Sequence, residues 1–92
     1  MIALTEVSQT TTGEYTVRSV YVNPSQVVMI REDSRYRSLV KEGKLSSLGF
    51  HDNVEFSRIT IRGGTSNYDI TVAGSAPTIY EKINYSKSLL KG

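Results

Sequence analysis

The turn Asn23-Pro24-Ser25 lies between two β-rich runs, and it constrains the fold of this chain more than any other stretch. Residues 17–22 (VRSVYV) and 26–31 (QVVMIR) are rich in β-branched side chains, which favour strands. Pro24 lacks an amide hydrogen and holds Asn23 in an extended conformation, so the first strand should end at Asn23. The second run is continuously apolar, which is typical of a strand covered on both faces.

Further strands are predicted on either side of this centre. Residues 2–7 (IALTEV) form a first strand, and the polar turn at residues 8–13 makes it a hairpin with the next strand. Residues 54–62 and 68–72 have the same strand character and flank a glycine-rich hairpin loop at residues 63–67. Alternation along the last strand predicts three inward side chains: Tyr68, Ile70 and Val72.

The C-terminal segment, residues 75–91, has the pattern of a helix. Ser75 is a favourable N-cap, and Pro77 suits the first helical turn. Apolar residues recur at helical spacing, so one stripe of the helix should pack on a face of the sheet. That stripe consists of Ala76, Ile79, Tyr80, Ile83 and Leu90.

Residues 33–53 form a long excursion between predicted strands. Within residues 34–42 we expect a short helix, capped at Ser34 and ended by Gly43. Its buried residues should be Leu39 and Val40. Long connections in small domains are often functional, so we expect the partner-facing part of the protein here.

These elements predict an α+β fold. Residues 1–92 are too few for two cores and should form a single domain. The expected architecture is an antiparallel sheet of about five strands with one C-terminal helix packed on it. A barrel-like closure of the sheet is the alternative, and an open sheet would leave its second face to solvent or to a partner.

Composition excludes several classes of protein. The chain has no cysteine, which excludes disulfides and thiolate metal sites and favours a reducing, cytoplasmic compartment. No apolar run approaches the roughly 20 residues of a membrane span, so no membrane association is expected. The formal charge of +2 is too small to indicate nucleic-acid binding by itself.

Catalytic chemistry has little support in the sequence. His51 is followed by Asp52, but no second histidine and no spaced set of ligands accompanies them. Gly63 and Gly64 lack the lysine and the strand-to-helix context of a phosphate-binding loop. We therefore expect a protein that is not an enzyme, with no catalytic residues, no metal site and no cofactor.

Basic and aromatic side chains give the main candidate binding site. An aromatic ring between guanidinium groups can stack on bases while the cations hold phosphates. The candidate contact residues are Arg31, Arg35, Tyr36, Arg37, Lys41, Arg58 and Arg62. Tyrosine is also overrepresented here, and at least two of the tyrosines are expected at a protein–protein interface.

The order of these elements resembles the small FlbD-like family associated with flagellar operons. Those proteins begin MI-x-L-T, have a strand ending in Leu-Asn-Pro and an Ile-rich strand, and close with a hairpin and an Ile- and Lys-rich helix. The matching segments are residues 1–5, 21–24, 27–32, 59–72 and 79–86. The resemblance implies a fold of hairpins with a terminal helix. The chain is also similar in style to small accessory proteins of bacteriophages.

The leading functional hypothesis is a small non-enzymatic module that binds another protein or itself. It would act through a sheet edge or the open sheet face, and self-association would produce a homo-oligomer. If the protein is phage-encoded, its compartment is the host cytoplasm. The alternative is an RNA- or DNA-binding domain that uses the Arg/Tyr cluster at residues 31–37 and the sheet face of Arg58 and Arg62.

Overall fold

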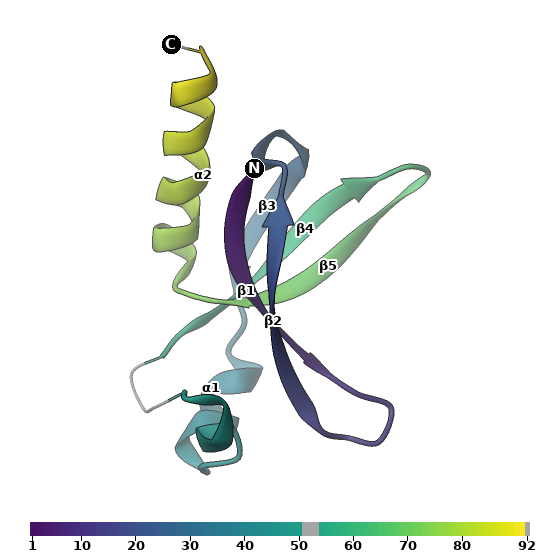
Figure 1. The fold of residues 1–92 in the computed structure, drawn as a ribbon, viewed down its shortest axis with the longest axis vertical. Coiled ribbons are helices and arrows are strands. Elements are labelled where there is room, and N and C mark those ends of the chain that lie inside the picture. The colour runs from purple at the N-terminus through teal and green to yellow at the C-terminus, as the bar shows by residue number, and fades with distance from the viewer. Residues whose placement is uncertain (51–53, 92) are drawn as a thin grey trace.

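The computed structural model describes residues 1–50 and 54–91, and the side chains of all of these except residues 47 and 88–91. It is an α+β fold with a five-stranded antiparallel sheet in the order β2-β1-β5-β4-β3 (Figure 1). The sheet stays open, so the barrel alternative is wrong. The elements are β1 (Ile2–Gln9), β2 (Tyr15–Val22), η1 (Pro24–Gln26), β3 (Val27–Glu32), α1 (Arg35–Lys41), η2 (Ser46–Leu48), β4 (Phe56–Gly63), β5 (Ser66–Ala73) and α2 (Ala76–Lys91).

Local chemistry ends β2 where the sequence predicts. Pro24 begins the 3-10 turn η1, and the Asn23 side chain accepts a hydrogen bond from the Ser25 N–H. Strand β1 pairs with β2 along its whole length, from Ile2 opposite Val22 onward. It therefore runs beyond the predicted end at residue 7, because the polar residues that follow are held in the ladder by their partners on β2.

The hairpin of β4 and β5 is tighter than predicted. Gly63 pairs with Ser66, so only Gly64 and Thr65 form the loop, and the predicted loop at residues 63–67 is wrong. Gly64 has a φ of +44°, and this left-handed conformation allows so short a turn.

Strand β3 lies at an edge of the sheet, and most of its side chains are exposed, so the prediction that this run is covered on both faces is wrong. Val28 and Met29 are 43% and 45% exposed. A register irregularity lies between Val27 and Met29, as expected of a β-bulge. The apolar run therefore combines side chains packed on the core with side chains that face solvent.

Helix α2 packs on one face of the sheet, as predicted. Among its described side chains Ile79 and Ile83 are buried, and the Ser75 hydroxyl caps it by accepting from the Thr78 N–H. Six strand residues complete this core: Ile2, Leu4, Val22, Ile59, Ile61 and Val72. The prediction that Tyr68 and Tyr80 point inward is wrong, because both side chains are exposed. The side chain of Leu90, the last residue of the predicted stripe, lies outside those that the structure describes.

The described part of the excursion, residues 33–50, packs against the sheet. Val40 and Leu45 are buried in a second core with Val7 and Phe56. Val7 neighbours Glu6, whose partner Val72 faces α2, so this second core lies on the opposite sheet face. In Figure 1, α1 and α2 also lie at opposite ends of the molecule. The expectation of an uncovered second face is therefore wrong for this end of the sheet.

Within the described ranges, no helix has the length and hydrophobicity needed to cross a membrane.

Candidate functional site

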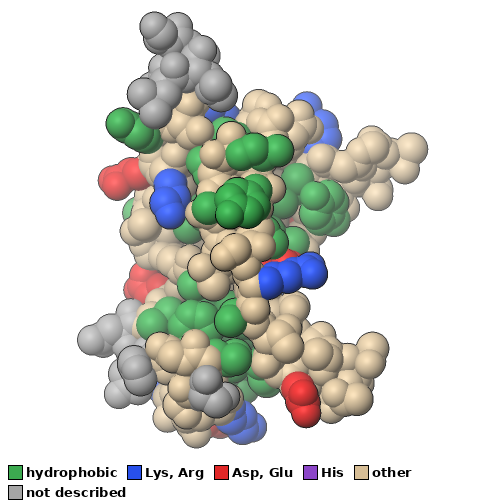
Figure 2. All heavy atoms as spheres, in the orientation of Figure 1, with side chains coloured by type: hydrophobic (Ala, Val, Ile, Leu, Met, Phe, Trp, Pro, Cys, Tyr) green, Lys and Arg blue, Asp and Glu red, His purple; other side chains and the backbone are tan. Residues whose placement is uncertain are grey.

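The predicted basic cluster is divided between two elements and the carboxylates that face them. Arg35, Tyr36, Arg37 and Lys41 belong to α1, whereas Arg31, Arg58 and Arg62 belong to β3 and β4. In Figure 2 the Lys and Arg side chains are scattered singly over the visible face and form no continuous basic patch. Whether each basic residue is available to a ligand therefore depends on its own ion pairs and hydrogen bonds.

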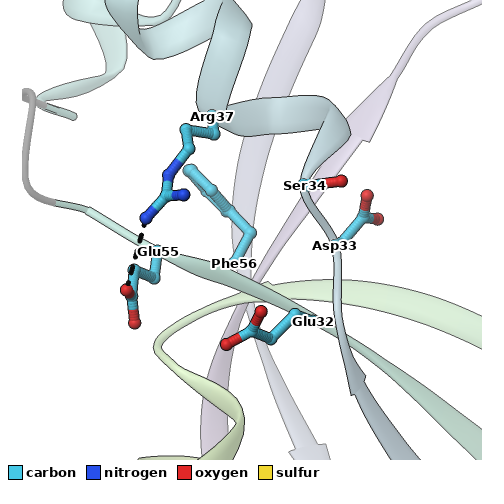
Figure 3. Close-up of a pocket in the computed structure, with 6 residues that line it drawn as sticks. All are labelled: Glu32, Asp33, Ser34, Arg37, Glu55 and Phe56. Carbon is cyan, nitrogen blue, oxygen red and sulfur yellow. Dashed lines mark ion pairs between the residues drawn. The ribbon is translucent and has the colours of Figure 1, made fainter.

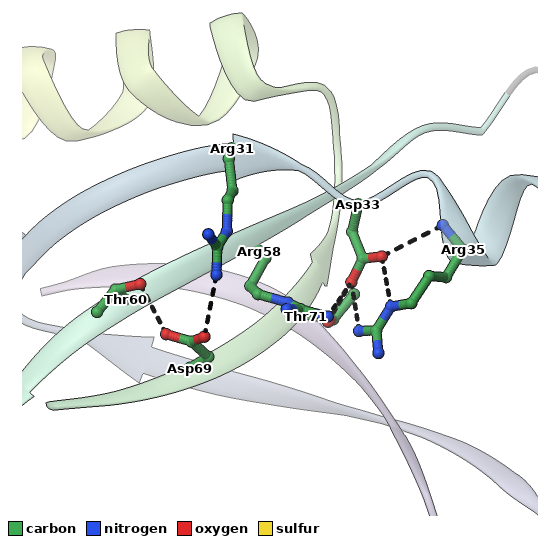
Figure 4. Close-up of polar contacts among 7 residues, drawn as sticks. All are labelled: Arg31, Asp33, Arg35, Arg58, Thr60, Asp69 and Thr71. Carbon is green, nitrogen blue, oxygen red and sulfur yellow. Dashed lines mark hydrogen bonds and ion pairs between the residues drawn. The ribbon is translucent and has the colours of Figure 1, made fainter.

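Asp33 is the centre of the strongest polar contacts. Its side chain is buried, and it accepts hydrogen bonds from Arg35 Nε and Nη2 at 2.9 and 2.8 Å (Figure 4). The Thr71 hydroxyl donates to it at 2.9 Å, and Arg58 Nη2 lies 3.6 Å away. Asp33 also accepts from the Arg35 backbone N–H. It therefore starts α1 in place of the predicted cap Ser34, whose side chain makes no capping bond.

Electrostatics fix the charge state of this group. The pKa of Asp33 is lowered from 3.8 to about 2, mainly by the hydrogen bond from the Arg35 side chain and to a smaller extent by the bond from Thr71, against the opposing effect of burial. The same contact raises the pKa of Arg35 above its ordinary value. The two groups thus form an ion pair at neutral pH, and Asp33 occupies the Nε and Nη2 donors of Arg35.

Tyr36 is part of the second core and not an exposed stacking platform. Its ring lies 5.3 Å from Phe56 and 6.0 Å from Tyr15, centroid to centroid. Burial raises the pKa of the Tyr36 hydroxyl. Tyr21 and Tyr85 differ from Tyr36, because their side chains are exposed and remain available to a partner.

The remaining basic residues differ in whether they form an ion pair. Arg31 lies 3.4 Å from Asp69, which also accepts from Thr60 (Figure 4), and Arg37 lies 3.7 Å from Glu55. Two exposed residues of the predicted set, Lys41 and Arg62, have no ion pair with any carboxylate that the structure describes.

A small pocket lies beside the Arg37–Glu55 pair (Figure 3). Its volume is about 40 Å³, which is enough for water but not for an organic ligand. Its lining residues are Glu32, Asp33, Ser34, Arg37, Glu55 and Phe56. Across residues 1–50 and 54–91, no group of His, Asp or Glu side chains is arranged to hold a metal ion.

An open groove between β3 and α2 is the larger concavity, with a volume of about 250 Å³. It is lined by Val27, Val28, Met29, Ile30, Tyr80, Ile83, Asn84 and Lys87. The β3 wall is apolar, the α2 wall combines Tyr80 and Ile83 with Asn84 and Lys87, and β3 is also a free sheet edge. The groove therefore combines apolar side chains with unpaired backbone groups, as sites for an added strand do.

Sequence reasoning missed this groove. The pattern of β3 predicts an interior strand, and the predicted helix stripe contains positions 80 and 83 but not 84 and 87. Their i, i+3, i+4, i+7 spacing was the available signal. The candidate pair His51 and Asp52 lies outside the described residues.

No family model, curated protein or solved structure matches the chain. The resemblances to the FlbD-like family and to phage accessory proteins therefore stay predictions.

Proposed function

We propose that this protein is a non-enzymatic protein-binding module that accepts an extended polypeptide segment along β3. The observation that carries the proposal is the free β3 edge beside the apolar groove of α2. An added strand would hydrogen-bond to the edge and place alternate side chains in the groove.

Backbone geometry supports this use of the edge. The Asp33 N–H donates to the Phe56 carbonyl, in register with the pairing of Glu32 and Ser57. In an antiparallel ladder the bonds alternate along each strand, so Asp33 and Arg31 point their backbone groups toward β4. The N–H and C=O groups of Ile30 and Glu32 consequently point outward, where another strand can use them.

The ion pairs weaken the competing nucleic-acid hypothesis. Phosphate binding depends on cations that can exchange counterions for phosphates. Arg35 and Arg58 share the buried Asp33, and Arg31 faces Asp69. Few cations of the predicted set remain unpaired, and they do not converge on one surface.

A peptide-binding assay tests the proposal. Peptides selected from a displayed random library would be labelled, and their affinities measured by fluorescence anisotropy. Glu32→Pro removes an outward N–H without removing a bond to β4, so it should weaken binding at least tenfold. Arg62→Ala is the matched control, because Arg62 is exposed and lies on β4, and it should leave the affinity unchanged.

Two outcomes would contradict the proposal. One is a selected peptide that binds Glu32→Pro as tightly as the original protein. The other is a labelled single-stranded oligonucleotide that binds better than any selected peptide, with an affinity that falls steeply with salt.

The proposed compartment is the cytoplasm, on the basis of the cysteine-free composition.

A further inference from the structure

We infer that the segment bound at β3 is the β3 strand of a second copy of this chain, in an antiparallel pair centred on Ile30. The inference rests on the proposed function and names its partner. A two-fold axis perpendicular to the sheet would place Ile30 opposite Ile30 of the second copy, and Val28 opposite Glu32. Such a pair is self-complementary and closes as a dimer.

Backbone direction restricts the register. Two strands related by this axis can pair only when the residues that face each other point to the same sheet face. The axis therefore passes through a residue position of β3. With Ile30 on the axis, the outward N–H and C=O of each Ile30 bond to the other copy, as in a hydrogen-bonded antiparallel pair.

Charge excludes the centres on the C-terminal side of Ile30. An axis at Arg31 would place the two Arg31 side chains opposite each other, and an axis at Glu32 would do the same to two carboxylates. Like charges directly opposite on a sheet are destabilising. With the axis at Ile30, Arg31 faces Met29, and no like charges are opposed.

The groove supplies the second complementarity. Ile30 pairs with Ile59 of the core, so its side chain is on the α2 face. Ile30 of the second copy would point to the same face, toward Tyr80 and Ile83 in the groove wall. An apolar residue on the axis thus meets an apolar part of the groove, and it does so in both copies.

A charge pair would form at each end of the strand pair. Lys87 is the one cationic residue lining the groove, and the C-terminal half of α2 that carries it runs beside the start of β3 (Figure 1). Glu32 of the second copy lies opposite Val28, at this same end and on the α2 face. The register therefore brings Glu32 of each copy toward Lys87 of the other.

Cysteine cross-linking tests the register, because the chain has no cysteine of its own. Ile30→Cys places two thiols at directly opposed positions, within reach of a disulfide, and should give a covalent dimer on mild oxidation. Val28→Cys is the control. Its two copies would lie four positions apart along the strands, roughly 13 Å, and should remain monomeric on a non-reducing gel.

Charge reversal tests the same register without touching the core. Glu32→Lys and Lys87→Glu should each raise the dimer dissociation constant about tenfold, measured by light scattering over a dilution series. The double variant should restore it. Far-UV circular dichroism of each variant confirms that it folds.

Three results would overturn the inference: a monomer at millimolar concentration, equal cross-linking of both cysteine variants, or no rescue by the double charge reversal. A monomer that still binds selected peptides, and binds them less tightly after Glu32→Pro, would overturn the dimer and leave the proposed function standing. A monomer that binds no peptide would overturn both.

Discussion

Replacing Asp33 by asparagine should remove a defined and pH-dependent part of the stability. The folded pKa of Asp33 is about 2, compared with 3.8 for an unperturbed aspartate. This difference corresponds to about 2 kcal/mol of stability when the carboxylate is ionised in both states. The asparagine side chain keeps the size of the aspartate but loses the charge that Arg35 and Arg58 share.

The sign of the pH dependence follows from the direction of the shift. Because the folded pKa lies below the unfolded one, the unfolded chain takes up the proton first as the pH falls. The contribution is fully present above about pH 5 and is lost as the pH falls through 3.8 toward 2. Asp33→Asn should therefore cost about 2 kcal/mol at pH 7 and almost nothing near pH 2.

Urea unfolding at several pH values measures this difference. The chain has no tryptophan, so far-UV circular dichroism or tyrosine fluorescence is the appropriate signal. Asp69→Asn is the matched control, because Asp69 and Arg31 are both substantially exposed. It should cost at most about 1 kcal/mol. The reasoning is refuted if wild type and Asp33→Asn lose the same stability between pH 5 and pH 2.

Three further substitutions test the fold by thermal or urea unfolding. Leu45→Ala should cost about 2–5 kcal/mol, because Leu45 is fully buried in the second core; a cost below about 1 kcal/mol would contradict that packing. Gly74→Ala should cost about 1–3 kcal/mol, since its φ is +127° and a new Cβ would lie 3.0 Å from Ile79 Cδ1; an unchanged midpoint would contradict this. Ser75→Ala should cost about 1 kcal/mol by removing the cap on the Thr78 N–H, and Ser75→Asp should retain most of the stability.

The candidate site was less predictable than the fold. Sequence spacing grouped Arg35, Tyr36 and Arg37 as a basic and aromatic surface. However, the side chain of Tyr36 packs on Phe56, and Arg35 pairs with a carboxylate two residues before it. Which of these side chains is buried depends on the face of α1 that meets the sheet. A short helix with mixed polarity does not specify that face by periodicity.

The sequence by itself determined the local features of this protein. Pro24 ended a strand and Ser75 started a helix, because each of these effects depends on the backbone chemistry of a few adjacent residues.

Only the tertiary structure decided the order of the strands. Pairing β1 with β5 placed β3 at an edge, and this exposed an apolar run that local pattern assigned to the interior. The same arrangement brought Thr71 and Arg58 to Asp33 across the sheet. Contacts between residues distant in sequence depend on the packing of whole elements, and periodicity within one strand contains no information about its neighbours.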